Sequence, residues 1–306
     1  MCKKKRFWKR VGRVWRKDDM LQGILFSLST GLCWACIGIV LSCCASKKLA
    51  VIPYSFLQTF LTGTAALFLV DFRKIGLHDL YILAGFIFLG GLLNSIGQNT
   101  VHNAMKRGHH TPVWAISQSA LIFPFLTGIL LFHEQGSAGH WIGTVLIVSG
   151  ILVTAMEGVK NVSGWIIPAV TAFFIFGMIQ TLHSMPSQLY GFRDPAGARP
   201  LAVAWGGTAG WLLIAACGKA SLRFDGKTLL IAGIMVLVQL LSLRLFFLSL
   251  DTLASENCVN IAFPLMTGTN ITAFAVYSIF IRREKTSLTD KIGFLLALAG
   301  LFFIAL

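Results

Sequence analysis

The sequence contains very little charge. Asp, Glu, Lys and Arg together make up 12% of the 306 residues, and only 12 residues are acidic. Soluble globular domains carry about 25% charged residues. Too few charged side chains are present to cover a water-facing surface, which excludes a soluble enzyme or a soluble binding domain. The apolar fraction of 56% indicates a membrane protein instead.

The chain also lacks the motifs of an intramembrane enzyme. It contains no HExxH and no GxSxG sequence, and its glutamates fall in loops or at the ends of apolar segments: Glu134, Glu157, Glu256 and Glu284. Catalysis needs a constellation of such groups. Cys33 and Cys36 form a C-x-x-C pair, but no His and no second such pair lies nearby, so we interpret them as packing residues. We expect no metal and no cofactor.

The net charge of +14 comes largely from one end of the chain. Nine of the 26 Lys and Arg residues lie in residues 3–17, and no basic patch follows that would read nucleic acid. On a helix the tail would gather Phe7, Trp8 and Trp15 on one arc and its basic residues on the rest. We therefore expect residues 1–19 to form a basic amphipathic cytoplasmic tail, either lying on an anionic membrane surface or serving as a positive anchor.

Ten apolar runs are long enough to cross a bilayer, which needs about 20 residues per helix. They lie at 20–43, 49–70, 79–103, 111–133, 139–157, 164–187, 200–218, 228–250, 256–281 and 289–306. The predicted fold is an all-α membrane protein with ten transmembrane helices. No segment between the runs is long enough for an extra soluble domain.

The second half repeats the first. Glu134, Gly143 and Gly150 have counterparts 150 residues later in Glu284, Gly293 and Gly300. Each copy is an apolar segment, a polar turn with one Glu, and a second apolar segment. Five helices per half reverse the direction in which the second half enters the membrane. We therefore predict two inverted five-helix repeats, residues 20–157 and 164–306, with the binding site between them.

Loop charges and the tail disagree about orientation. Outside the tail, Lys and Arg favour a cytoplasmic location for the loops that follow the odd-numbered spans, whereas the tail places the first span with its N-terminus inside. The first helix usually dominates. We expect both termini in the cytoplasm and a bacterial inner membrane as the location.

These features resemble the drug/metabolite transporter superfamily, and in particular its EamA-like ten-helix members. The resemblance covers residues 20–306 and includes residues 102–108, which look like the family's end of helix three, with residues 247–252 as their counterpart. It implies alternating access, a central cavity lined by helices one, three, four, six, eight and nine, and a functional monomer. The small four-helix relatives couple export to protons through a Glu in helix one. The first span here has no acidic residue, so that mechanism is not carried over.

Polar side chains inside a membrane are costly and generally face the bundle interior. The third span has the strongest such stripe, with Asn94, Gln98 and His102 at intervals of four residues. We take this stripe to line the cavity, although hydrogen bonding between helices would also explain it. Further candidate substrate-binding residues on the other predicted cavity helices are Trp34, Gln118, Gln180, His183, Gln239, Arg244, Asn257 and Asn260.

Two alternatives stay open from the sequence. Gln239 and Arg244 lie on different faces of the eighth span and cannot both line one narrow cavity. Either Arg244 faces the cavity and attracts an anionic substrate, or Gln239 does and Arg244 snorkels to the interface. His102 and His183 either carry coupling protons or are hydrogen-bonded packing groups.

We predict a secondary transporter that moves a small organic metabolite, such as a sugar or an amino acid, by rocking two inverted halves. Export and uptake both remain open. The expected partners are the small-molecule substrate, the lipid bilayer and a possible coupling proton, with no nucleic acid. The alternatives are a membrane scaffold without transport, which leaves the polar third span unexplained, and an intramembrane enzyme.

Overall fold

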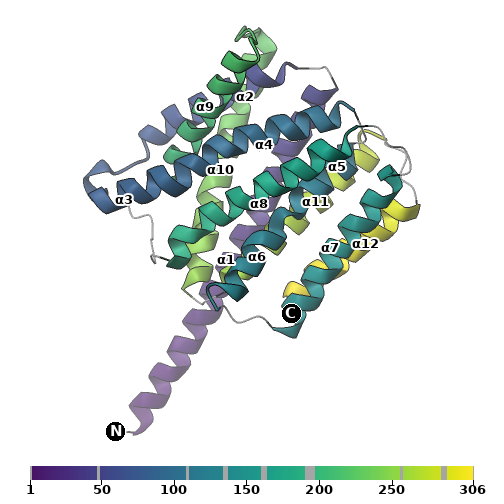
Figure 1. Cartoon of the computed structure of the whole chain (residues 1–306). Coiled ribbons are helices and arrows are strands. Elements are labelled where there is room, and N and C mark those ends of the chain that lie inside the picture. Colours follow the sequence, from purple (N-terminus) through teal and green to yellow (C-terminus); the bar gives the residue numbers. More distant parts are fainter. Residues whose placement is uncertain are drawn as a thin grey trace.

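The chain folds into a bundle of helices (Figure 1). The computed structural model describes residues 2–46, 49–107, 110–133, 137–159, 164–189, 197–255, 258–283 and 288–305, and within these ranges it contains helices and no strand. The segments are α1 (Cys2–Ala45), α2 (Val51–Leu67), η1 (Phe72–Lys74), α3 (Leu77–Ile82), η2 (Leu83–Phe88), α4 (Leu89–Met105), α5 (His110–Gln118), η3 (Ser119–Leu121), α6 (Ile122–Leu130), α7 (Ala138–Val159), α8 (Ile166–Leu189), α9 (Arg199–Cys217), α10 (Gly226–Ala254), η4 (Val259–Ile261), α11 (Ala262–Phe280) and α12 (Leu288–Ala305).

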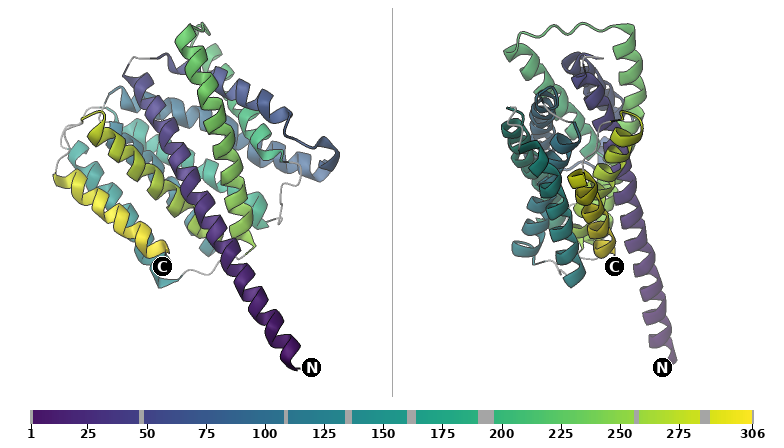
Figure 2. Two further views of the ribbon diagram at one scale, coloured as in Figure 1. Left: turned by 180° about the vertical axis from the view of Figure 1, so that it is seen from behind. Right: turned by 90° about the vertical axis from the view of Figure 1, so that its right-hand side faces the viewer.

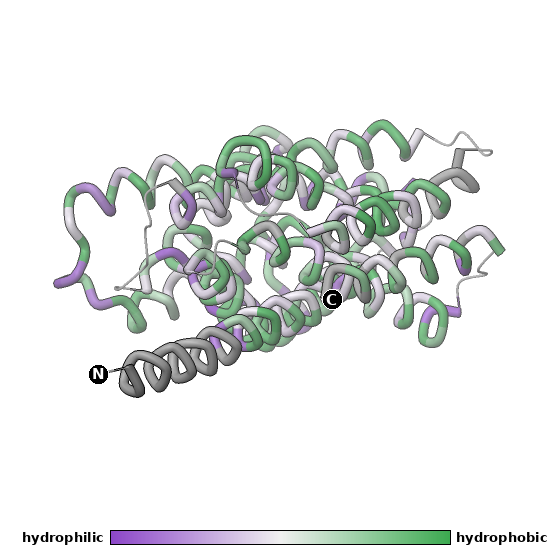
Figure 3. The backbone as a smooth tube through the Cα atoms, turned by 90° about the horizontal axis from the view of Figure 1, so that it is seen from below, coloured by the Kyte–Doolittle hydropathy of each residue, from purple (hydrophilic) through white to green (hydrophobic). Residues whose placement is uncertain are grey.

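All ten predicted runs are helical, which confirms the all-α fold class. Six helical stretches are long and apolar enough to cross a membrane by length and composition: 19–45, 77–105, 110–130, 166–188, 199–217 and 226–254. Shorter apolar stretches lie in α7 and α12. Apolar residues run along the helices (Figure 3), and many of them are exposed on the outside, such as Ile167 and Leu237. Such a surface is stable only in contact with lipid.

The basic tail continues the first spanning helix. α1 runs without interruption from Cys2 to Ala45, and its first part projects from one end of the bundle (Figure 2). The basic tail and the first span are therefore parts of one continuous helix. The side chains that would form its amphipathic arc lie outside the described residues.

Helix packing is preserved when the two halves are exchanged. α1 packs against α10 and α11, and α8, its counterpart in the second half, packs against α4 and α5. In the same way α2 packs against α10 and α9 against α4. The remaining large contacts join equivalent helices, α2 with α9 and α7 with α12. This is the pattern expected of two repeats related by a pseudo-two-fold axis, and the repeats interleave rather than forming separate bodies.

The repeat extends to the backbone conformation of single residues. His133 and Arg283, which are 150 positions apart, both adopt positive φ, at 53° and 54°. In each half the preceding helix ends with an amide that reaches back five residues, Phe132 to Thr127 and Arg282 to Tyr277. The glutamates that follow, Glu134 and Glu284, lie outside the described residues. The two copies of the motif thus end their first helix in the same way.

The repeated glycines allow the last helices of the halves to cross closely. A Cβ atom on Gly300 of α12 would lie 2.5 Å from the carbonyl oxygen of Gly143 in α7. On the same pair of helices, a Cβ on Gly139 would lie 2.8 Å from the carbonyl oxygen of Phe303. Small residues at such crossings allow two backbones to come into van der Waals contact within a membrane.

A proline shapes the fourth predicted span near the cavity. Pro124 has no N–H group, so it cannot donate to the carbonyl group four residues earlier. The preceding turn, η3, is a 3-10 helix that separates α5 from α6. Gln118, the last residue of α5, lies just before this change and is buried in the bundle.

We predict that Gly300→Ala destabilises the fold by about 1–3 kcal/mol, because the added methyl group meets backbone that cannot move aside. The matched control is Gly233→Ala on the exposed side of α10, where a Cβ has nothing within 4 Å. That variant should keep or slightly raise stability, since Ala favours a helix by about 0.8–1.0 kcal/mol over Gly. Melting temperatures in detergent would check this, and equal melting temperatures for the two variants would contradict the close crossing.

Candidate functional site

A cavity of about 100 Å³ lies at the centre of the bundle, between helices of both halves. It is formed by α1, α4 and α5 from the first half and by α8, α9 and α10 from the second. Its lining residues are Trp34, Ile37, Asn94, Gln98, Trp114, Gln118, Phe176, Ile179, Gln180, His183, Val203, Gln239, Leu243 and Phe246. The position between the repeats is that expected of a transporter site.

Seven of the eleven predicted site residues surround this one cavity. They are Trp34, Asn94, Gln98, Gln118, Gln180, His183 and Gln239. Of the other four, His102 lies one turn beyond Gln98 and lines a different pocket near the end of α4. Asn257 lies outside the described residues, and so does the side chain of Asn260.

The eighth span presents Gln239, and not Arg244, to the cavity. The Gln239 Oε1 atom accepts a hydrogen bond from Gln58 Nε2 of α2, at 3.5 Å. Arg244 is exposed, and its Nη1 atom lies against Gly197 in the segment before α9. In this conformation Arg244 is therefore placed for an interfacial role rather than for contact with a ligand in the cavity.

The polar lining consists of carboxamides. Asn94, Gln98, Gln118, Gln180 and Gln239 each offer one acceptor and two donors. None of the described residues that line the cavity carries a full charge. The Oε1 atom of Gln180 is buried and accepts no hydrogen bond from any described residue. A buried carbonyl oxygen without a partner is rare, and it marks a place where a ligand or water donates.

A hydrogen-bonded chain orients one side of the lining. Trp114 Nε1 donates to Asn270 Oδ1 at 3.1 Å, and Asn270 Nδ2 donates to Gln118 Oε1 at 3.2 Å. Asn270 is fully buried in α11. It therefore holds both cavity residues of α5 in place and leaves the amide nitrogen of Gln118 for other contacts.

Aromatic rings form the rest of the wall. The Trp34 ring lies 5.6 Å from Phe246, which in turn lies 5.9 Å from the His183 imidazole. The Trp114 indole packs directly on the backbone of α1 at Gly38. A Cβ atom at this position would lie 2.6 Å from the indole, so only glycine allows this contact. The residues predicted from the sequence did not include Phe176 or Phe246. Phe176 lies four residues before the predicted Gln180, which is a signal that helical spacing could have used.

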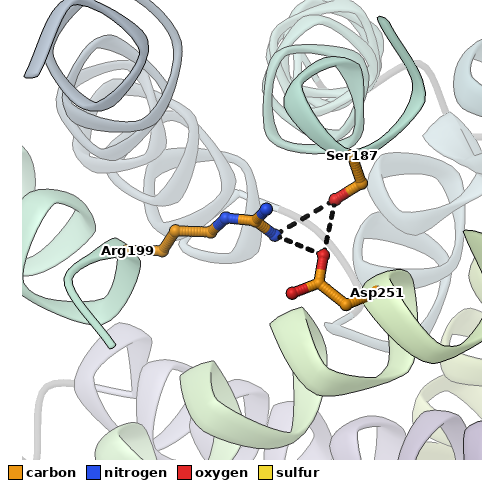
Figure 4. A network of polar contacts seen from close by, with 3 residues as sticks. All are labelled: Ser187, Arg199 and Asp251. Atoms are coloured by element: carbon orange, nitrogen blue, oxygen red, sulfur yellow. Dashed lines mark hydrogen bonds and ion pairs between the residues drawn. The ribbon is translucent and has the colours of Figure 1, made fainter. Parts of the chain in front are cut away.

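One end of the cavity helices is joined by a buried ion pair (Figure 4). Arg199 Nη1 at the start of α9 donates to Asp251 Oδ1 near the end of α10 at 3.0 Å and to Ser187 Oγ of α8 at 3.1 Å. Ser187 Oγ also donates to Asp251 Oδ1 at 2.9 Å. The Arg199 side chain is 0% exposed, and its guanidinium carbon lies 5.2 Å from the centre of the Phe247 ring.

This ion pair lies at the end of the bundle where the first span begins. Gly23 of α1 packs against Leu253, and Ser27 Oγ lies 2.6 Å from Ser249 Oγ. α8, α9 and α10 are thus held together beside the start of α1.

The opposite end carries a second polar cluster. His110 Nδ1 at the start of α5 lies 2.9 Å from Ser42 Oγ of α1 and 3.1 Å from Arg282 Nη1 after α11. Arg282 Nη1 also donates to Ser42 Oγ. Nearby, Thr111 Oγ1 donates to Ser278 Oγ at 2.8 Å. These contacts join α1, α5 and α11.

We predict that Asp251→Ala destabilises the protein by about 3–5 kcal/mol, because it removes the carboxylate that contacts the buried Arg199 guanidinium. The double variant Arg199→Met/Asp251→Leu should recover most of this loss, since replacing both partners by apolar residues is often neutral. Thermal or denaturant unfolding of Arg199→Met, Asp251→Leu and the double variant would give the coupling energy. Additive losses would contradict a direct ion pair.

Comparison with known proteins agrees with this geometry. An all-helical chain with apolar outer faces and a polar cavity between two repeats is a multi-pass membrane protein of the transporter class. The model of the EamA-like transporter family matches residues 21–156. The match covers the first half of the chain and confirms there the resemblance to the EamA-like transporters of the drug/metabolite transporter superfamily. A match to this family supports a membrane transporter.

The fold is shared with solved structures. One of them, described only as "Crystal structure of protein", has a TM-score of 0.67 with 15% sequence identity and covers 93% of this chain and 98% of its own. No curated protein sequence matches the chain.

Proposed function

We propose that this transporter carries a small, uncharged, hydroxyl-rich metabolite of the sugar or polyol type. The observation that supports this most directly is the cavity lining of five carboxamides and four aromatic rings, without a charged side chain among the described lining residues. Carboxamides both donate and accept, as hydroxyl groups do. An ionic substrate would lose its hydration in this cavity without gaining a counter-charge.

The aromatic residues favour a ring-shaped substrate. Trp34 and Trp114 come from different helices and both present indole surface to the cavity. A broad apolar indole face packs well against the C–H face of a sugar ring. The carboxamides of α4, α8 and α10 would then bind the hydroxyl groups at the edge of that ring.

The similar helix packing in the two halves supports transport by alternating access. A cavity of about 100 Å³ has room for about three waters, at about 30 Å³ each. Binding sites for small molecules measure about 300–1,000 Å³. The cavity must therefore widen to admit a substrate, which requires that the halves rock apart at one end while the other end stays closed.

Both halves lie in one chain and together form the cavity, so we propose that the functional unit is a monomer. We also propose a bacterial inner membrane with both termini in the cytoplasm. α12 ends at the same end of the bundle from which the start of α1 projects (Figures 1 and 2). The Arg199–Asp251 pair would then close the cytoplasmic side. Fusing a reporter that is active only in the cytoplasm to the C-terminus tests this orientation.

We predict that neutral sugars or polyols raise the melting temperature of the purified protein, because a ligand that binds the folded state stabilises it. Amino acids, nucleosides, carboxylates and cationic drugs form the comparison panel. Gln180→Leu should weaken binding about 2- to 12-fold, the value of one net hydrogen bond of about 0.5–1.5 kcal/mol. Gln22→Leu on the exposed start of α1 is the matched control, and Arg244→Ala should also leave the affinity unchanged.

The opposite result would be stabilisation by acids alone that disappears in Arg244→Ala. It would show that Arg244 faces the substrate in the binding state and that the substrate is anionic. Counterflow of the stabilising ligand in proteoliposomes separates transport from binding. A ligand that binds but is not moved would favour the scaffold alternative.

His183 is the candidate carrier of a coupling proton in the cavity. Its Nε2 atom is buried against Gly90 and has no hydrogen-bond partner among the described residues. We predict that His183→Asn abolishes substrate accumulation driven by a pH gradient but retains exchange of substrate at equal pH. Uptake into proteoliposomes with and without the gradient measures both. If the gradient has no effect on the parent protein, His183 carries no coupling proton.

A further inference from the structure

A second pocket lies at the end of the bundle opposite the Arg199–Asp251 pair. Its volume is about 440 Å³, within the range of about 300–1,000 Å³ of small-molecule sites. It is bounded by the last turn of α1, the start of α2, the end of α4 and the turn after α9. Its lining residues include Ala50, Val51, Ile52, His102, Lys106 and Ser221.

The first turn of α2 lines this pocket. Ala50 is the N-cap residue, and no side chain accepts a hydrogen bond there. Tyr54 donates its backbone N–H to Ala50, and Pro53 has no N–H to donate. The amides of Val51 and Ile52 are left without partners inside the helix. Together with the positive end of the helix dipole they form a typical binding position for an anion.

Two side chains of α4 lie in the same pocket, one helical turn apart. His102 is only 2% exposed, and its Nδ1 atom has no hydrogen-bond partner among the described residues. Lys106 is exposed at the rim, and both ion pairs found in the described part of the chain involve other residues. Burying an imidazole nitrogen without a partner is costly. Such a group is expected where a ligand completes the site.

The internal repeat allows the two ends of the bundle to be compared. The last turn of α4, with His102 and Lys106, corresponds to the last turn of α10, with Asp251, and the start of α2 corresponds to the start of α9 with Arg199. In the second half a carboxylate and a guanidinium meet at these positions, 3.0 Å apart. In the first half an ammonium group and a helix N-terminus share the pocket, and both are positive. An anion between them would complete the equivalent contact.

We propose that this pocket binds an oxyanion, a phosphate or carboxylate group, through the amides of Val51 and Ile52, the His102 imidazole and the Lys106 ammonium group. No acidic side chain belongs to the described lining, which speaks against a cation. The group comes either from a free small molecule or from the headgroup of an anionic lipid. The proposal does not rest on the substrate of the central cavity, and its test involves no transport.

The experiment measures binding of inorganic phosphate to the purified, delipidated protein by thermal shift and calorimetry at constant ionic strength. Phosphate should stabilise the parent protein in a saturable manner. Lys106→Gln should weaken binding about 10- to 100-fold, as expected from loss of a charge-assisted contact. Arg107→Gln removes the same charge from the next, exposed position and should change the affinity less than 2-fold.

Ala50→Asp separates loss of the site from loss of the fold. Asp is a preferred N-cap residue, so its carboxylate should occupy the free amides of α2 and keep or raise the melting temperature. The same carboxylate should abolish phosphate binding. The proposal is overturned if the parent shows no saturable effect, if Ala50→Asp binds phosphate as the parent does, or if Arg107→Gln loses as much affinity as Lys106→Gln.

Lipid nanodiscs identify the source of the anion. Phosphatidylglycerol, compared with phosphatidylcholine, should compete with phosphate if a lipid headgroup occupies the pocket. Equal phosphate affinity in both lipids assigns the pocket to a free anion. Either result supports the oxyanion site, provided that Lys106→Gln removes the binding.

Discussion

The structure depends on one constraint, which is that polar groups surrounded by lipid must be bonded inside the protein. Helices satisfy the backbone, and the polar side chains turn inward to pair with each other. Ser27 meets Ser249 between α1 and α10, and Asn270 joins Trp114 to Gln118. Because most inward polar groups are paired in this way, the unpaired ones become informative. Among those in the described part of the chain, Gln180 Oε1 and His183 Nε2 belong to residues that line the central cavity, and His102 Nδ1 to a residue that lines the pocket beside α2; others, such as Thr144 Oγ1, lie elsewhere in the bundle.

Much of this arrangement could be predicted from the sequence, because it follows from periodicity and from the scarcity of charge. The ten helices need only long apolar runs, and the stripe of Asn94 and Gln98 needs only a period of about four residues. The choice between Gln239 and Arg244 could not be made in this way. Helical spacing gives the angle between two side chains but not which of them faces the bundle. That is decided by neighbours, here by Gln58 of α2, which reaches Gln239.

Other features have no local signal. Arg199 and Asp251 are 52 residues apart at the ends of different helices, and only the fold brings them together. Phe246 enters the cavity wall from a helix that is apolar on most sides. The amides at the start of α2 belong to the backbone, and their only trace in the sequence is the lack of a capping residue at Ala50. The sequence therefore predicts the polar side chains of the cavity, whereas the aromatic side chains and backbone groups beside them become apparent only from the tertiary structure.

The two ends of the bundle differ although the two halves share one fold. At the end beside the start of α1, the protein supplies both charges of the contact that joins its helices, Arg199 and Asp251. At the other end, the pocket between α2 and α4 has Lys106 and the N-terminus of α2 and no acidic side chain among its described lining residues. An inverted-repeat transporter alternates between two closures that are equivalent in packing, and these need not be equivalent in chemistry. One end holds its helices with an ion pair from the chain itself. If the pocket at the other end binds an anion as proposed, and if the anion binds one of the two states more tightly, the balance between the states would depend on that anion.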